Sequence, residues 1–385
     1  MTRTALVIGA GIGGLATAVA LRHEGWDVEV RERAPAPPST GTSLGLWPGG
    51  LRALDALGLG ATARGLSREA ARGRFVRADG TLIGNVDMEE LRRRAGDAVR
   101  VISRPALLGA LTDALGDGTG GGTCDGTAAG TGDRTGDRTC GGIVRYGQQV
   151  TDVRALAADH DVVVAADGLR SRARAALFGP AHRPRYSGVS AWHGTVALDV
   201  PDMTETWGDG ARFGVTPRKG GTAHWFACAR APERATYPEG ELAAVRARFG
   251  TWHAGVRQVL DRLAAAGPEG VEVHRNDLYD LAAPLPRYVS GRVALVGDAA
   301  HAMTPDLGRG ACEALADGVA LARELAARDR VEAALSAYDA ARRRPTQRLA
   351  RAARVMNRAV HTRRRVAPVR DAAMRLYLTL GRPPA

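Results

Sequence analysis

Lysine is almost absent from this chain of 385 residues, and Lys219 is its single example. Arginine supplies the rest of the 53 basic residues, which exceed the 41 acidic residues and give a net charge of +12. A protein that binds nucleic acid gathers such residues on one surface of a recognisable module. Here arginine is spread along the whole chain, so we interpret it as solvated surface with, at most, a general attraction for anionic ligands.

Long apolar runs and clustered cysteines are also missing. No stretch approaches the roughly 18 continuous apolar residues of a membrane span, so we expect no integral membrane segment. The four cysteines show no metal-ligand spacing, which predicts no metal site and free thiols, with a Cys124–Cys140 disulfide as the less favoured alternative. A strand pattern starts at Ala5 and leaves no room for a signal peptide, so we expect a cytoplasmic protein.

The first motif is a glycine turn between an apolar strand pattern and a helical pattern. Gly9, Gly11 and Gly14 have the spacing GxGxxG, and a second strand pattern then ends in Glu32. In such a unit the first glycine permits the tight turn, the second lets a pyrophosphate approach, and the third lets helix and strand pack closely. Glu32 is placed to bind ribose hydroxyls. Because FAD and NAD both use this unit, it does not choose between them.

A second turn follows the buried-strand pattern of residues 161–166. Asp167 and the glycine after it make the turn, with Ser171 and Arg174 at the start of the next helical pattern. We expect Asp167 to cap and hold this turn, and plain strand–turn–helix chemistry is the alternative reading. Arg104 starts an earlier helical pattern and could point at a cofactor phosphate or ribose, although this position alone favours a surface arginine at a helix start.

A third turn comes after the apolar run of residues 293–296. Asp298 lies at the carboxyl end of that strand pattern, where its carboxylate can accept a hydrogen bond from a sugar-type hydroxyl. A loop from Pro305 to Gly310 then begins a long helical pattern. The backbone N–H groups around Leu307 and Gly308 therefore lie at the positive end of a helix, where developing negative charge is stabilised.

Strand patterns dominate from about residue 183 to residue 275, which indicates a largely antiparallel sheet that covers a pocket. His193, Arg212 and His224 fall on three of these strands and could converge on a substrate. We predict that Arg212 orients an anionic or carbonyl-bearing substrate. The two histidines are candidate bases for a phenol, and a partly exposed strand position is the alternative for each of them.

The three turns, in this order, resemble those of the single-component FAD-dependent aromatic hydroxylases. This group A flavoprotein monooxygenase superfamily includes p-hydroxybenzoate, salicylate and FAD-dependent urate hydroxylases, and the resemblance covers nearly the whole chain. It implies FAD contacts near the adenosine and pyrophosphate, near the ribityl chain and flavin ring, and a turn shared by FAD and NAD(P)H. The residues near the adenosine and pyrophosphate would be Gly9, Gly11, Gly14, Glu32, Arg33 and Arg104. Those near the ribityl chain and flavin ring would be Gly45, Val150, Asp298, Pro305, Leu307, Gly308 and Gly310. Asp167 would belong to the turn shared by FAD and NAD(P)H. The resemblance also implies that His193, Arg212 and His224 line the substrate pocket.

The same resemblance implies an α/β fold: a Rossmann-like FAD-binding domain interleaved with a mostly antiparallel β-sheet substrate domain, plus C-terminal helices. The length also predicts two domains. For the tail, we favour packing against the cofactor domain over docking on a membrane surface. The predicted parts are 1–70, 98–182 and 276–345 for the FAD-binding domain, including a low-complexity loop at 116–142; 71–97 and 183–275 for the substrate domain; and 346–385 for the C-terminal helical segment.

The implied activity is that of a monooxygenase. In this family NAD(P)H reduces FAD, O2 adds to form a flavin C4a-hydroperoxide, and one oxygen passes to an aromatic or polyketide-like small molecule. Open alternatives are a non-oxygenating flavin reductase or dehydrogenase, an epoxidase or Baeyer–Villiger variant, and a basic non-catalytic binding protein. The chain departs from the family pattern in the third turn, where Asp306 stands at a position at which asparagine is commoner.

Overall fold

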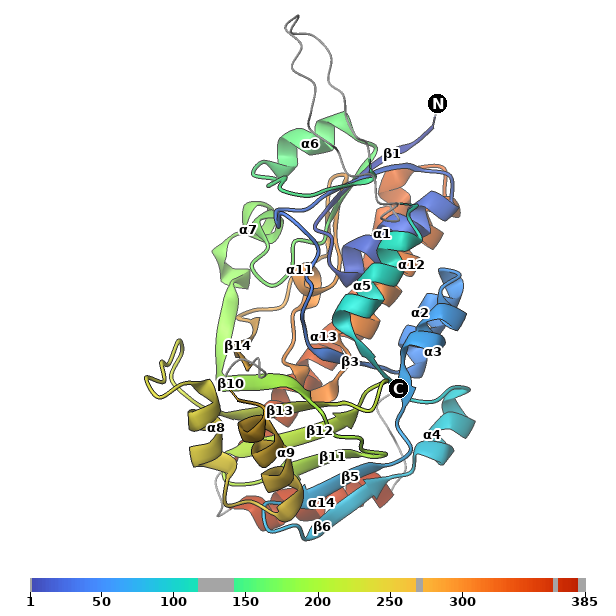
Figure 1. Cartoon of the computed structure of the whole chain (residues 1–385). Coiled ribbons are helices and arrows are strands. Elements are labelled where there is room, and N and C mark those ends of the chain that lie inside the picture. The colour runs from blue at the N-terminus through green and yellow to red at the C-terminus, as the bar shows by residue number, and fades with distance from the viewer. Residues whose placement is uncertain (1, 117–141, 268–272, 363–365, 380–385) are drawn as a thin grey trace, which may run out of the picture.

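The computed structural model describes residues 2–116, 142–267, 273–362 and 366–379. Cys124, Cys140 and nearly all of the low-complexity segment lie outside the described residues. Figure 1 shows a mixed α/β layer in the upper part of the molecule and a broad sheet in the lower part. Among the described helices, none has the length and apolar character that crossing a bilayer requires.

The upper layer contains a six-stranded sheet. Its strand order is β15-β16-β9-β1-β2-β8, and all neighbours are parallel except β15 and β16. Because the chain leaves β1 for neighbours on both sides, the carboxyl end of β1 is a topological switch point, where open α/β sheets bind their ligands. The bounds are β1 (Thr4–Ile8), β2 (Asp27–Arg31), β8 (Val144–Arg145), β9 (Val162–Ala165), β15 (Val289–Ser290) and β16 (Val293–Leu295).

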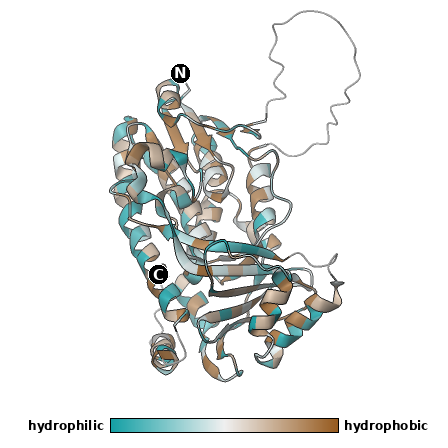
Figure 2. Ribbon diagram, turned by 90° about the vertical axis from the view of Figure 1, so that its left-hand side faces the viewer, coloured by the Kyte–Doolittle hydropathy of each residue, from teal (hydrophilic) through white to brown (hydrophobic). Residues whose placement is uncertain are grey.

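Helices cover this sheet closely, so its central strands read as continuous apolar runs. All four residues of β9 are buried, and the ribbon near the N-terminus is largely brown in Figure 2, where brown marks hydrophobic residues. Helix α1 (Ile12–His23) packs against α12 (Gly310–Ala326) at Gly318, where an added Cβ would lie 2.7 Å from the backbone nitrogen of Thr17. The absence of a side chain at Gly318 therefore allows these two helices to approach closely.

The lower part is a seven-stranded sheet in the order β14-β10-β13-β12-β11-β5-β6. Neighbours are antiparallel except the parallel pair β11 and β5. One face packs on two helices through Trp192, Phe213 and Trp225. The bounds are β5 (Gly73–Arg77), β6 (Leu82–Val86), β10 (Pro184–Val196), β11 (Met203–Trp207), β12 (Ala211–Pro217), β13 (Ala223–Arg230), β14 (His274–Leu281), α8 (Glu241–Phe249) and α9 (Ala254–Ala265). The two sheets together confirm the predicted fold class.

A third sheet and further helices complete the fold. A small antiparallel sheet in the order β3-β7-β4 lies beside the start of α5. The bounds are β3 (Ser43–Leu46), β4 (Arg68–Glu69), β7 (Arg100–Ser103), α2 (Pro48–Ala56), α3 (Gly60–Leu66), α4 (Met88–Ala95), α5 (Arg104–Asp113), α6 (Val153–Asp159), α7 (Arg172–Phe178), η1 (Pro180–His182), α11 (Asp298–His301), η2 (Pro305–Leu307), α13 (Val331–Val360) and α14 (Ala367–Thr379).

The C-terminal helix α14 lies on β6, at the edge of the lower sheet (Figure 1). Asp371 accepts a hydrogen bond from Arg77 Nε at 2.6 Å, and Met374 joins an apolar cluster with Ile83 and Trp207. The expectation that the tail, from Val331 onward, packs against the cofactor domain agrees with α13, which packs on α12. It is wrong for α14, because the apolar side of α14 completes the edge of the lower sheet instead. The predicted boundary at residue 346 falls inside the continuous helix α13.

Candidate functional site

The glycine turn lies at the carboxyl end of β1. Gly9 has φ +104°, and an added Cβ would lie 2.5 Å from the carbonyl oxygen of Ala166; a Cβ on Gly14 would overlap the carbonyl oxygen of Gly9. A Cβ on Gly11 would meet nothing within 4 Å, and Gly11 is an N-cap without a capping side chain. The N-terminus of α1 is thus open to an anionic group at the switch point.

Glu32 follows β2 and holds the glycine turn. One carboxylate oxygen accepts a hydrogen bond from Ala10 N, and the other from Ala34 N, each at 2.8 Å. Its neighbour Arg33 is exposed. The acid that sequence reasoning placed beside a ribose is therefore fixed in position by one backbone donor inside the glycine turn and one just after Glu32 itself.

The second turn contacts the third through Arg174. Asp167 caps α7, since its Oδ2 accepts hydrogen bonds from Arg172 N at 2.8 Å and Ala173 N at 3.1 Å. Its Oδ1 is buried and has no hydrogen-bond partner among the described residues. Arg174 is buried and donates to the carbonyl oxygens of Asp298 at 3.2 Å and Ala299 at 3.0 Å. The structure therefore brings two turns, separate in the sequence, into direct contact.

Asp298, the first residue of α11, is exposed. The protein packed around it raises the pKa of Asp298, while the positive charges of His301, Arg104 and Arg174 act in the opposite direction. Arg104 is the first residue of α5 and is itself exposed. Arg104 and Asp298, which the sequence predicts at one cofactor, thus lie near enough to interact electrostatically.

The loop from Pro305 to Gly310 lies alongside β3. An added Cβ on Gly45 would be 3.7 Å from the carbonyl oxygen of Gly308, and Cys312 Sγ donates to the Gly45 carbonyl at 3.4 Å. Pro305 and Leu307 bound η2, Gly308 has φ +61°, and Gly310 begins α12. Val150 lies apart from this loop, before α6, where it packs on the core of the upper sheet.

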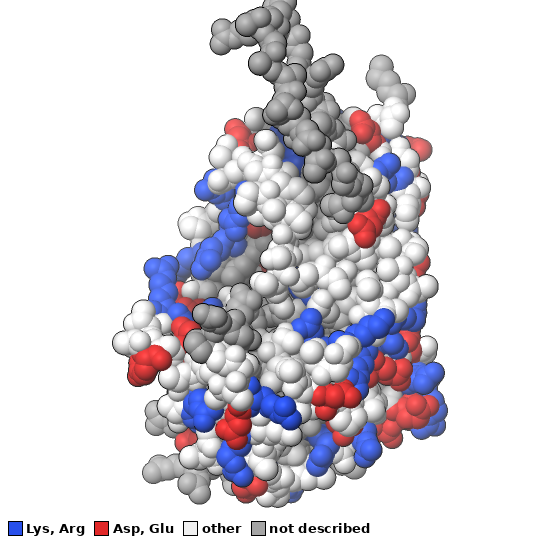
Figure 3. Space-filling view, in the orientation of Figure 1, with Lys and Arg blue, Asp and Glu red and all other residues white. Residues whose placement is uncertain are grey.

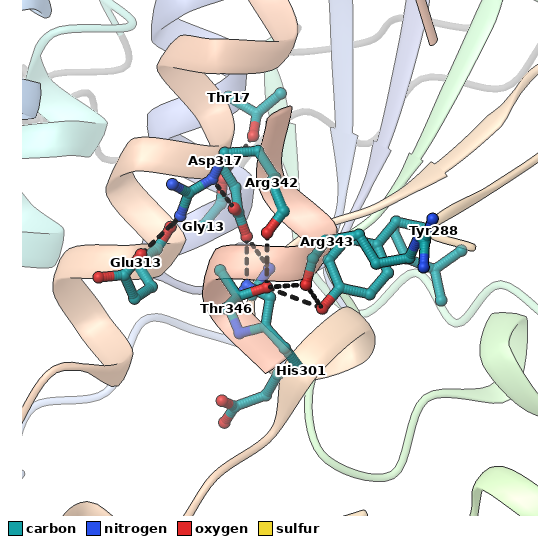
Figure 4. A network of polar contacts seen from close by, with 12 residues as sticks. Gly13, Thr17, Tyr288, His301, Glu313, Asp317, Arg342, Arg343 and Thr346 are labelled. Atoms are coloured by element: carbon teal, nitrogen blue, oxygen red, sulfur yellow. Dashed lines mark hydrogen bonds and ion pairs between the residues drawn. The ribbon is translucent and has the colours of Figure 1, made fainter. Parts of the chain in front are cut away.

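A buried polar network lies beneath the third turn (Figure 4). Asp317 of α12 accepts hydrogen bonds from Gly297 N at 2.9 Å and Arg342 Nε at 2.7 Å, and pairs with His301 Nε2 at 2.6 Å. Burial alone would raise the pKa of Asp317, but the charges of His301 and Arg342 lower it; conversely, Asp317 raises the pKa of His301. Sequence reasoning missed Asp317, although an acid within the apolar run of α12 was a signal.

The lower sheet brings His193, Arg212 and His224 onto one face, the one opposite α8 and α9. This follows from the register, in which His193 pairs with Phe226, Arg212 with Cys228 and His224 with Thr216. The three side chains are buried. Their strands β10, β13 and β12 are neighbours, as the sequence predicted.

Arg212 joins the lower sheet to the third turn. Its Nη2 lies 3.1 Å from Asp306 Oδ1, and its Nη1 lies 3.2 Å from Glu205 Oε1. Burial lowers the pKa of Arg212, but Asp306 and Glu205 raise it and prevail, so the guanidinium stays charged. Asn357 of α13 donates to Asp306 Oδ2 at 3.1 Å. Asp306, the departure from the family pattern, is therefore the acid that pairs with Arg212.

A cavity of about 180 Å³ adjoins this ion pair. Its walls come from the lower sheet, from the loop of the third turn and from α4, α13 and α14. The lining includes Arg212 but neither His193 nor His224. The lining residues are Trp47, Phe75, Val86, Asp87, Glu90, Leu91, Arg94, Glu205, Trp207, Arg212, Asp306, Leu307, Met356, Val360, Met374 and Leu378.

Residues 2–353 match the family described as FAD binding domain. The aurachin C monooxygenase/isomerase of Stigmatella aurantiaca is 33% identical over 346 residues, covering 88% of this chain and 85% of that protein. The chain belongs to the FAD-dependent monooxygenases. The 3-amino-4-hydroxybenzoate 2-monooxygenase of Streptomyces cremeus is 33% identical to this monooxygenase, and the match covers 92% of this chain and 85% of that protein. The crystal structure of Klebsiella pneumoniae HpxO with FAD and uric acid matches this structure with a TM-score of 0.83 and 25% sequence identity. The match covers 98% of this chain and 95% of the HpxO chain.

The geometry of the monooxygenase fits FAD as its cofactor. Gly9 and Gly14 leave no room for a Cβ, whereas the open space at Gly11 and the uncapped start of α1 suit a pyrophosphate. The unpartnered Asp167 Oδ1 suits a hydroxyl donor. The roles of the individual residues at FAD and at the substrate stay predictions.

The two predicted histidines differ from ordinary surface histidines. Burial is the main cause that lowers the pKa of His193 to about 4, and the neighbouring His274 lowers it further. Burial is also the main cause that lowers the pKa of His224 to about 3, and His193 and Arg218 add to this effect. His193 Nε2 lies 2.8 Å from Asn276 Nδ2. Both imidazoles are therefore neutral at pH 7 and are weak bases.

We predict that the free energy of unfolding falls as the pH is lowered from about 6.5 to 4. In the unfolded chain a histidine titrates near 6.5, so in this range the unfolded state binds protons that His193 and His224 do not bind in the fold. At pH 5 each histidine contributes a loss of about 2 kcal/mol. Urea unfolding at several pH values measures this, and His193→Asn should reduce the slope while His23→Gln, at an exposed position, should not. A slope unchanged in His193→Asn would contradict the prediction.

Proposed function

We propose that this monooxygenase hydroxylates an aromatic small molecule, with NAD(P)H as reductant and O2 as the oxygen source. The observation that supports this most strongly is the contact between Arg212 and Asp306. Through it, the cavity on the lower sheet shares a wall with the loop that is predicted to lie at the flavin ring. A ring bound in that cavity would lie beside the flavin. We also propose that the enzyme acts in the cytoplasm, where NAD(P)H is available.

The relatives support an aromatic substrate, since their names refer to aurachin C, urate and 3-amino-4-hydroxybenzoate. Bound FAD supplies the redox chemistry, because it takes electrons from a reduced nicotinamide and activates O2. The residues of the chain itself bind the cofactor, orient the substrate and shield both from water. Gly9, Gly11 and Gly14 would hold the pyrophosphate, and Asp298 would hold a hydroxyl of the ribityl chain.

At the substrate, the residues exclude water and fix orientation. Trp47, Leu307 and Trp207 contribute apolar side chains to the cavity wall, and such side chains help to keep water away from reactive intermediates. Arg212 would orient the ring, since its Nε is buried and has no hydrogen-bond partner among the described residues. His193 and His224 lie on the same face of the lower sheet as Arg212 but do not line this cavity. Their lowered pKa values favour hydrogen bonding over proton abstraction at neutral pH.

The oxygen source can be tested directly. With 18O2, NAD(P)H and an aromatic that stimulates NAD(P)H oxidation, we expect one 18O atom in each molecule of product. The measurement is mass spectrometry of the product, with H2(18)O and ordinary O2 as the control that should give no label. NAD(P)H oxidation without any labelled product would overturn the proposal and support the flavin reductase instead.

A further inference from the structure

Another cavity, of about 520 Å³, lies between the helices α2, α12 and α13. Among the described residues it shares no lining residue with the cavity beside Arg212. The third turn adjoins both cavities, since Asp306 and Leu307 line the first and Arg309 lines the second. The loop that is predicted to lie at the flavin ring therefore has a different cavity next to each of its two parts.

Arginine dominates the lining of this second cavity. Among the described residues, four arginines line it together with a single acid, Glu313. Glu313 accepts hydrogen bonds from Arg309 at 3.2 Å and from Arg342 at 2.7 Å, the latter drawn in Figure 4. Arg52 donates to a backbone carbonyl at 3.2 Å, and neither Arg52 nor Arg348 has an acidic partner in the described part of the chain. The cavity thus has an excess of positive charge.

This excess differs from the charge pattern of ordinary surface. On the face drawn in Figure 3, basic and acidic residues lie next to one another along the lower right edge, as is typical of solvated side chains that pair loosely. Arg52 and Arg348 are exposed, so the cavity reaches solvent, whereas Cys312 on its wall is buried. An anion could therefore enter from solvent and be partly enclosed.

Arg52 also lies at the positive end of a helix. An added Cβ on Gly49 would be 3.8 Å from Arg52 Nη2, so the guanidinium is close to the first turn of α2. This helix begins without a hydrogen bond from a capping side chain. Both the start of a helix and a guanidinium favour phosphate groups, and here the two coincide on one wall of the cavity.

The position and the size of the cavity suit a nucleotide near the flavin. Cys312 lines the cavity and donates to the carbonyl oxygen of Gly45 at 3.4 Å, and the guanidinium carbon of Arg309 lies 5.8 Å from the centre of the Trp47 ring. A cavity of roughly 150 Å³ holds a benzene, so 520 Å³ holds roughly 20 non-hydrogen atoms, which is about the size of one nucleotide.

We propose that this cavity binds a phosphate-bearing part of the reduced nicotinamide dinucleotide, with Arg52 and Arg348 in contact with its phosphates. The inference rests on the proposed function, because it assigns a site to the reductant which that function requires. Asp167, in the turn to which the resemblance gives a role with NAD(P)H, is not among the described residues that line this cavity. Reductant and aromatic substrate would occupy separate cavities, so the two can be bound at the same time.

Two binding measurements on the FAD-loaded enzyme test the proposal. Anaerobic stopped-flow reduction of the flavin gives the Kd of NADH and of NADPH, and calorimetry with ADP-ribose gives a Kd that does not depend on flavin reduction. Arg52→Gln and Arg348→Gln should each weaken binding of the dinucleotide and of ADP-ribose about fivefold. Raising NaCl from about 0.05 M to about 0.5 M should weaken binding to the wild type more than to the double variant.

A second arginine of α13 provides the matched control. Arg351 is exposed and is not among the described residues that line the cavity, so Arg351→Gln removes the same charge from the same helix and should behave as the wild type. Inorganic phosphate is the second probe for calorimetry. It should bind more weakly than ADP-ribose, because it fills only a small part of the cavity.

The proposal is overturned if Arg52→Gln and Arg348→Gln bind ADP-ribose and the dinucleotide as tightly as Arg351→Gln does. It is also overturned if the wild type does not bind ADP-ribose, or if inorganic phosphate binds as tightly, which would indicate a general anion site. A flavin that neither NADH nor NADPH reduces would contradict the proposed function instead, and calorimetry would still decide the inference about the cavity.

Discussion

Replacing Gly14 with alanine is expected to abolish FAD binding and to lower the free energy of unfolding by about 3 kcal/mol or more. A Cβ at this position would overlap the carbonyl oxygen of Gly9 and lie 3.1 Å from the Cβ of Ala166. Backbone forms the nearest wall, so the added methyl cannot be accommodated by a side-chain rotation. Either α1 moves away from β1 or the turn changes shape, and both displace the N-terminus of α1. Flavin content after purification and urea unfolding measure the two effects.

Two other glycines provide controls with different expected outcomes. A Cβ on Gly11 meets no protein atom within 4 Å, so Gly11→Ala should keep the stability of the apoprotein while weakening FAD binding. Gly109 lies inside α5 with equally open surroundings. Gly109→Ala should leave FAD binding unchanged and stabilise the fold by up to about 1 kcal/mol. Normal flavin content in Gly14→Ala, or equal effects of Gly11→Ala and Gly109→Ala on FAD binding, would contradict this account of the turn.

Asp317→Ala is expected to lower the free energy of unfolding by about 3 to 5 kcal/mol, the range for breaking a buried ion pair from one side. The carboxylate is fully buried, and its removal takes away the partner of His301 and of Gly297 N and one of the two acids that pair with Arg342. Gly297 directly precedes Asp298, so the third turn should loosen as well, and FAD should be retained less tightly. Urea unfolding and the dissociation rate of FAD measure these effects.

A surface ion pair and a conservative variant complete this experiment. Glu332→Ala removes an acid that is 3.9 Å from Arg330 on an exposed part of α13, and it should change stability by no more than about 0.5 kcal/mol. Asp317→Asn keeps the shape but removes the charge, so its loss should lie between those of the other two. A stability loss in Asp317→Ala no larger than in Glu332→Ala would show that the network of Figure 4 is not a stabilising feature.

The upper sheet could be predicted well because its signals are local. A glycine turn, an acid at a strand end and an apolar run each depend on residues within about 30 positions, which is the length of one βαβ unit. The helix that starts at Arg104 is an example, since the serine directly before it, Ser103, accepts an N-cap hydrogen bond from Ala106 N. In the lower sheet, alternation along each strand indicated which residues share a face within that strand, whereas the register between the strands puts His193, Arg212 and His224 on one face.

Long-range pairing explains what the sequence did not reveal. Arg212 contacts Glu205 across a hairpin, but it contacts Asp306 across a large sequence separation. No periodicity in the sequence predicts a contact of the second kind. Glu205 and Asp317 were therefore missed as members of the site and of the network beneath it. The position of α14 was mistaken because its few apolar residues fit either part of the molecule, and only the exposed edge at β6 decides between them.

The Arg212–Asp306 ion pair has a consequence for recombination between related enzymes. A chimera that takes its lower sheet from a relative and keeps the third turn of this chain would inherit one charge of the pair without the other. Exchange of substrate preference by transplanting strands would then demand that the residue at position 306 travel with the residue at position 212. The two parts of the molecule have separate sheets, but the residues at positions 212 and 306 have to be exchanged together.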